Sequence, residues 1–108
     1  MVKPLKDIIG LLRKKNPNVV VLVGHLNLND GSALQIRPLV EAMAAEMSTK
    51  KSPVVAVHHY KGWIEKPDAK GADTFDWVHP NPRGQRKMAK AWFEAMKPYL
   101  PGAPAVRQ

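Results

Sequence analysis

The chain has 108 residues, no cysteine, a net charge of +8 and a hydrophobic content of 44%. This length favours one domain with a modest core, and the hydrophobic content is too high for a disordered chain. The absence of cysteine excludes disulfides, thiolate zinc ligands and a thiol nucleophile. Basic residues are spread over every segment, which favours a solvated basic surface over a nucleic-acid-binding face.

The amino-terminal residues lack the pattern of a signal peptide, because no basic segment leads into an apolar stretch with a small-residue cleavage site. The longest apolar run, Val19 to Val23, is too short to cross a bilayer. The sequence as given therefore predicts a cytoplasmic protein with no membrane partner.

A first helix and a first strand are predicted at the start of the chain. Four apolar residues have helical spacing: Leu5, Ile8, Ile9 and Leu12. This helix should end at Asn16-Pro17, since the residue before proline disfavours helix. The unbroken β-branched run within residues 18–23 is typical of a strand buried on both faces of a parallel sheet. A polar loop, residues 24–31, follows that strand.

A second helix and a second strand come next. Ser32 and Gln35 fit a capping box at the start of this helix. Its expected apolar face consists of Leu34, Ile36, Leu39, Val40, Met43 and Met47. Residues 54–58 then form a second short buried strand.

The last part of the chain contains a long irregular stretch, residues 60–78, followed by a third helix. Asn81 is the expected N-cap of this helix, with Pro82 at its first position. One face of the helix is apolar: Met88, Trp92, Ala95, Met96 and Tyr99. We therefore expect a single domain over residues 1–100 and a frayed tail over residues 101–108.

The predicted order α-β-α-β-α is typical of an α/β fold with parallel strands and helical crossovers. Two strands alone would leave two unprotected sheet edges beside apolar helices. We therefore expect the chain to self-associate, as a dimer that joins its sheets or exchanges elements.

Asp76 and His79 lie three residues apart, just before the third helix. This spacing can place a carboxylate beside an imidazole, where it would accept the Nδ1 proton and leave Nε2 to act as a general base. Asp-x-x-His is a common pattern, however, and an aspartate that caps a turn near an exposed histidine is the structural alternative.

The wider block resembles the last conserved block of the SGNH (GDSL-type) ester hydrolases, especially the branch with carbohydrate and acetyl esterases. The residues that carry this resemblance are Asp76-Trp77-Val78-His79-Pro80-Asn81, then Gly84, Lys87-Met88-Ala89 and Trp92. Residues 16–23 and 53–57 are similar to the penultimate and last strands of those enzymes. The resemblance covers roughly residues 5–97 and implies the C-terminal half of a flavodoxin-like three-layer α/β/α sandwich. Full-length relatives can be secreted.

The resemblance implies that His79 is the catalytic base and Asp76 its orienting partner. It also implies a small acyl ester or an acetylated sugar as substrate, with no cofactor. The family's Gly-Asp-Ser motif does not occur in these 108 residues, so the nucleophile is left open. Ser32 is the best-placed serine, although capping of the second helix would explain it equally well. The alternative functions are a catalytically incomplete fragment and an oligomeric or binding module without turnover.

Three further histidines could converge with His79 on one sheet edge: His25, His58 and His59. Imidazoles suit transition metals, but no compact ligand pattern is present, so we expect no metal site. The expected role of His25 is in a substrate cleft, together with Tyr60 and Trp77. Tyr60, Trp77 and Trp63 could stack on a sugar ring, or serve as partly buried packing residues.

Overall fold

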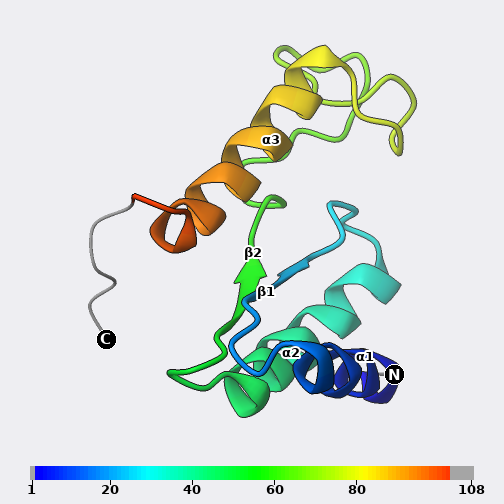
Figure 1. Ribbon diagram of the computed structural model, residues 1–108. Helices are drawn as coiled ribbons and strands as arrows, with labels where there is room; N and C mark the ends of the chain where they lie inside the picture. The colour runs from blue at the N-terminus through cyan, green and yellow to red at the C-terminus, as the bar shows by residue number, and fades with distance from the viewer. Residues whose placement is uncertain (1, 103–108) are drawn as a thin grey trace.

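The computed structural model describes residues 2–102 of the chain (Figure 1). The helices are α1 (Lys3–Lys15), α2 (Gly31–Met47) and α3 (Pro82–Met96), and the 3₁₀ helix η1 (Lys97–Tyr99) follows α3. The strands are β1 (Val21–Gly24) and β2 (Val54–Val57). The predicted alternation of helices and strands is confirmed. Of the expected tail, residues 101 and 102 form an exposed turn, and residues 103–108 lie outside the described residues.

The two strands form a parallel pair, with Val21 opposite Val54 and Gly24 opposite Val57. Parallel pairing was predicted, but β1 begins at Val21, three residues later than expected. The backbone before it forms a turn instead, in which Val19 N donates to Asn16 O at 3.0 Å. Pairing begins only where a partner exists, at the bond from Val21 N to Pro53 O.

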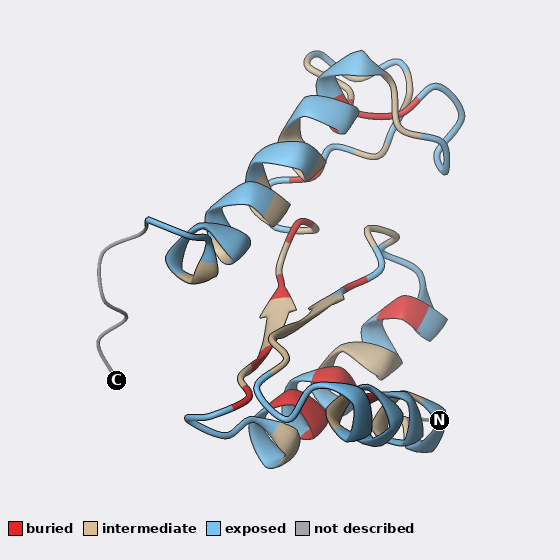
Figure 2. Cartoon of the chain, in the orientation of Figure 1, coloured by how far each residue is buried: buried red, intermediate tan, exposed pale blue. Residues whose placement is uncertain are grey.

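The core lies between the strands and the first two helices. Figure 1 shows α1 and α2 together on one side of the strand pair and α3 on the other. The central buried residues are Ile9, Met43, Ala44 and Val54, with Leu5, Val21, Val23, Met47 and others packed around them. In Figure 2, buried segments of α2 lie beside α1, while the outer sides of α1 and α3 are exposed.

Helix α2 differs from its prediction at its start and on its buried face. Its N-cap is Asp30, whose Oδ1 accepts a hydrogen bond from Ala33 N at 2.9 Å, so the expected capping box of Ser32 and Gln35 is wrong. The helix therefore begins one residue before Ser32, at Gly31. The small residues Ala33 and Ala44 are buried, whereas Leu34 and Leu39 are exposed. Val40 and Met43 of the predicted face are buried as expected. The two alanines were not part of that face, because small side chains contribute little to a pattern of hydrophobic spacing.

Helix α3 begins as predicted, with Pro82 first and Asn81 as the N-cap; Asn81 Oδ1 accepts from Gly84 N at 2.9 Å. Its apolar face is only partly covered. Trp92 stacks on His59 at a ring-centroid distance of 6.0 Å, but Phe93 and Met96 remain exposed. Helix α1 is similar, since Ile9 is buried while Ile8 and Leu12 are exposed.

Candidate active site

Asp76 and His79 form a single tight turn just before α3. Asp76 Oδ1 accepts hydrogen bonds from His79 N at 2.7 Å and Val78 N at 3.1 Å. Its other oxygen, Oδ2, lies 2.6 Å from His79 Nδ1. The backbone reverses at Trp77, whose φ of 78° lies in the left-handed region that side-chain-bearing residues rarely adopt. This strained residue, Trp77, lets the chain fold back so that one carboxylate serves three donors.

The turn is held in place by the residues on either side of it. Thr74 is buried, and its Oγ1 accepts from Trp77 N at 2.9 Å and donates to Glu65 O at 2.6 Å. Phe75 N donates to His79 O at 2.9 Å, and this bond closes a small antiparallel bridge between Thr74 and Pro80. The turn is therefore a closed, hydrogen-bonded unit.

Asn81 joins this unit to α3. Besides capping the helix, its Nδ2 donates to Ala72 O at 2.8 Å. Its backbone N donates to Asp73 O at 2.9 Å. Asn81 was predicted as a cap only. Its hydrogen bonds to the preceding loop explain how the start of α3 fixes the position of His79.

The sequence did not reveal an ion pair between Asp73, in the loop before the turn, and Lys87 on α3. Asp73 is fully buried, and its Oδ2 accepts from Ile64 N at 2.8 Å and from Lys87 Nζ at 2.7 Å. Gly84 packs directly on Asp73, because a Cβ there would lie 2.1 Å from Asp73 O. The partners are 9 to 14 residues apart and join a loop to a helix. Such a separation gives no periodic signal in the sequence.

The hydrogen bonds to Asp76 fix its charge. The backbone bond from His79 is the main cause that lowers the pKa of Asp76 from 3.8 to about 2, followed by the imidazole of His79 and the backbone of Val78. An ionised carboxylate can only accept, so His79 Nδ1 must donate to it. In the neutral imidazole Nε2 then carries the lone pair, so this side chain, which is 74% exposed, can accept a proton from a hydroxyl group.

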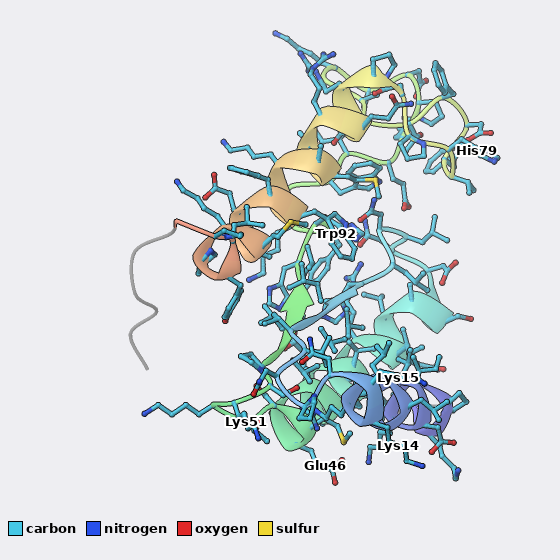
Figure 3. All side chains as sticks on the ribbon, in the orientation of Figure 1. Lys14, Lys15, Glu46, Lys51, His79 and Trp92 are labelled. Atoms are coloured by element: carbon cyan, nitrogen blue, oxygen red, sulfur yellow. The ribbon has the colours of Figure 1, made fainter. Side chains whose placement is uncertain are left out.

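His79 projects from the outer edge of its loop (Figure 3), and no serine within residues 2–102 forms a hydrogen bond with it. Ser48 and Ser52 lie beyond the C-terminal end of α2, where Ser52 Oγ donates to Val19 O at 2.6 Å and Ser48 Oγ accepts from Val54 N at 3.0 Å. Ser32 lies exposed in the first turn of α2, next to the Asp30 cap. It is thus the one serine without a structural hydrogen bond in the described part of the chain.

A shallow hollow of about 230 Å³ joins the loop before α2 to the turn that carries the dyad. Leu28, Asp30 and Glu65 line it together with Trp77 and Val78. Trp77, predicted as a substrate contact, is 51% exposed there. Ser32 and His79 are not among its lining residues, but their chain neighbours Asp30 and Val78 are.

The other predicted contacts lie in a separate place. His25 and Tyr60 meet edge to face, with ring centroids 5.1 Å apart, beside His58 and Glu41. His59 bonds instead through its Nδ1 to Asn27 Oδ1; burial, with the nearby His25, lowers the pKa of His59. The expected convergence of all four histidines is not observed, since the hydrogen bonds of His79 stay within its own turn. Trp63, at 7% exposure, is a packing residue.

Within the described residues, no helix has the length and apolar character needed to cross a membrane. Comparisons with curated proteins and with solved structures gave no match. A family model, GDSL-like Lipase/Acylhydrolase, matches residues 3–92. That span contains both strands, α1, α2, the turn with Asp76 and His79, and most of α3. The chain belongs to the GDSL-like lipase/acylhydrolase family.

Proposed function

We propose that this chain is a carboxylic-ester hydrolase in which Asp76 and His79 activate a serine hydroxyl. The observation that carries this proposal is the 2.6 Å contact between Asp76 Oδ2 and His79 Nδ1, in a turn that leaves Nε2 open to solvent. Such a pair orients the imidazole and stabilises the imidazolium that forms during acyl transfer.

The proposed reaction proceeds by two acyl transfers. The serine Oγ attacks the ester carbonyl, and its proton passes to His79 Nε2. His79 then gives this proton to the leaving alcohol, so that an acyl-serine remains. Water attacks the acyl-serine, loses a proton to His79, and releases the acid and the free serine.

Ser32 is our candidate for the nucleophile. It is exposed at the start of α2, and the Asp30 loop before it and the His79 turn line the same hollow. Asp30 provides the helix cap, so the hydroxyl of Ser32 has no capping function to compete with catalysis.

The proposed substrates are short acyl esters of carbohydrates. Trp77 presents half of its side chain beside the hollow, and an indole face is a common platform for a sugar ring. Asp30 and Glu65 add carboxylate oxygens, which accept hydrogen bonds from sugar hydroxyls.

We further propose that a second copy completes a three-layer α/β/α sandwich around the two strands. Support comes from large exposed apolar side chains on all three helices: Ile8, Leu11 and Leu12 on α1, Leu34 and Leu39 on α2, and Phe93 and Met96 on α3. A two-stranded sheet also has two open edges. Analytical ultracentrifugation should find a dimer at micromolar concentration, and a stable monomer would contradict this.

The activity test uses purified wild-type protein with Ser32→Ala and His79→Ala, on p-nitrophenyl acetate and an acetylated xylose ester. We expect His79→Ala to lower kcat/KM about a thousandfold, because general-base catalysis is lost. Equal rates in wild type and His79→Ala would refute the proposal. Ser48→Ala is the matched control, since Ser48 lies beyond the other end of α2.

A fluorophosphonate probe identifies the nucleophile directly, because it labels only an activated serine. Mass spectrometry should find the label on Ser32 in wild type and none in His79→Ala. The second candidate function is a catalytically incomplete chain, favoured by the lack of any hydrogen bond between a serine and His79 in residues 2–102. Absence of both turnover and label would select this candidate over the first.

A further inference from the structure

A second cluster of titratable side chains lies at the carboxyl ends of the two strands. Gly24 pairs with Val57, so the residues that follow them, His25 and His58, leave the sheet side by side. Their rings stack with centroids 5.3 Å apart, and His25 N donates to Val57 O at 3.2 Å. The parallel register thus brings together two imidazoles that are 33 positions apart.

Glu41 on α2 completes this cluster. Its Oε1 contacts Nε2 of both histidines, at 2.8 Å for His25. One potential ligand atom from each of the three residues lies within 4.8 Å of the others. Arg37, one turn earlier on α2, does not compete for this carboxylate: its Nη2 donates to Leu28 O at 2.9 Å.

The donor set fits a transition-metal ion. Two imidazole nitrogens and one carboxylate oxygen are a known protein ligand set for Zn²⁺, with a fourth position open to water. For metal–ligand bonds of about 2.0–2.1 Å, tetrahedral ligands lie roughly 3.3 Å apart. Nε2 of His25 lies 2.8 Å from Glu41 Oε1 and would need to move about 0.5 Å away to admit an ion.

We propose that His25, Glu41 and His58 form a binding site for a divalent transition-metal ion, with Zn²⁺ as its best probe. The imidazole of His25 is fully buried, and its Nε2 lies 2.8 Å from Glu41 Oε1, so one ligand is already held in place. The other two side chains are partly open, at 46% for Glu41 and 38% for His58, so an ion can reach the site.

Bound metal would connect α2 directly to the ends of β1 and β2. Tyr60 lies edge-on against both imidazoles, and the Arg37 guanidinium lies 3.8 Å from its ring centroid, so the site has one walled side. Binding to the folded chain alone would raise its melting temperature by mass action. This effect is independent of the proposed esterase activity.

Zn²⁺ titration by calorimetry, together with thermal melting, tests the proposal on the full chain. We expect one Zn²⁺ per chain and a melting temperature that rises with Zn²⁺ but not with Mg²⁺ or Ca²⁺, which prefer oxygen ligands. Co²⁺ should give the visible bands of a tetrahedral site. Glu41→Gln and His58→Ala should each weaken binding roughly tenfold or more, since both remove a ligand.

Two controls separate this site from incidental binding. Glu46→Gln changes an exposed carboxylate on the same helix, and His79→Ala removes the exposed imidazole of the other cluster. Both should bind Zn²⁺ as the wild type does. Unchanged affinity in Glu41→Gln and His58→Ala, or a loss confined to His79→Ala, would overturn the proposal. His25→Ala is not used because its buried side chain also supports folding.

Discussion

Two regions of this molecule place histidine beside a carboxylate, and they do so by different means. Asp76 and His79 meet within one turn, and both side chains are more than half exposed. His25, Glu41 and His58 come from three separate elements, and the ring of His25 is fully buried. The Asp76–His79 pair needs only the local backbone to form its contact. The three-residue cluster needs the register of the two strands and the rotation of α2 about its axis, which turns Glu41 toward the histidines.

This difference separates the roles that each region can have. The exposed pair leaves one imidazole nitrogen open to solvent, as a proton acceptor requires. In the cluster of His25, Glu41 and His58, Nε2 of both histidines already contacts the Glu41 carboxylate, so neither Nε2 is free to take a proton from substrate. A set of converging nitrogen and oxygen donors is instead suited to hold a cation.

The largest expected effect is the loss of esterase activity in Asp76→Asn. The amide would present a donor to His79 Nδ1 and favour the wrong tautomer, so kcat/KM should fall roughly a thousandfold. Steady-state kinetics with p-nitrophenyl acetate measures this. Asp68→Asn is the control, since Asp68 is 79% exposed on the same loop and lies 3.9 Å from Lys66. A similar fall in both variants would mean that the loop, and not the dyad, had been disturbed.

The second-largest expected effect is a loss of stability when the packing of Gly84 against Asp73 is disturbed. In Gly84→Ala, the new Cβ would meet Asp73 O at 2.1 Å and the Trp63 ring at 2.7 Å. Because one of these is backbone, the start of α3 must shift, and we expect a loss of about 2–3 kcal/mol in the free energy of unfolding. Urea denaturation measures this loss.

Gly10→Ala is the matched variant for Gly84→Ala. Nothing lies within 4 Å of a Cβ at Gly10, in the exposed middle of α1. Alanine should therefore raise the free energy of unfolding by about 0.5–1 kcal/mol, through its better helix propensity. Equal urea midpoints for the two variants would contradict the close packing of Gly84 on Asp73.

The sequence predicted the order of elements because each depends on local patterns. The Asn81-Pro82 start of α3 and the stop of α1 at Asn16 are set by backbone chemistry within a few residues. The start of α2 was predicted wrongly because Asp30 and Ser32 are both good caps, and only the path of the preceding loop selects Asp30. The buried alanines of α2 were missed because small side chains contribute little to a pattern of hydrophobic spacing.

The same distinction holds for the two clusters. The contact between Asp76 and His79 could be predicted from their spacing, because three residues span one turn. Glu41 carried no signal, since it lies among the exposed residues of α2 and becomes informative only when β1 and β2 are paired. Asp73 and Lys87 were missed for the same reason: their contact joins a loop to a helix 14 residues away.

The smallest expected effect is a change in the pKa of Asp76 in His79→Ala, which tests whether the turn keeps its structure without the imidazole. The lowered pKa of Asp76 means that its charged form stabilises the folded turn above about pH 4, and that this contribution is lost as the pH falls through about 2. In His79→Ala the backbone donors of residues 78 and 79 remain and only the imidazole is lost. Carboxyl ¹³C NMR should therefore find a midpoint above about 2 but still below 3.8. A full return of the Asp76 midpoint to 3.8 would mean that the turn opens without its imidazole. The Asp76–His79 turn would then depend on side-chain contact as much as the cluster of His25, Glu41 and His58 does.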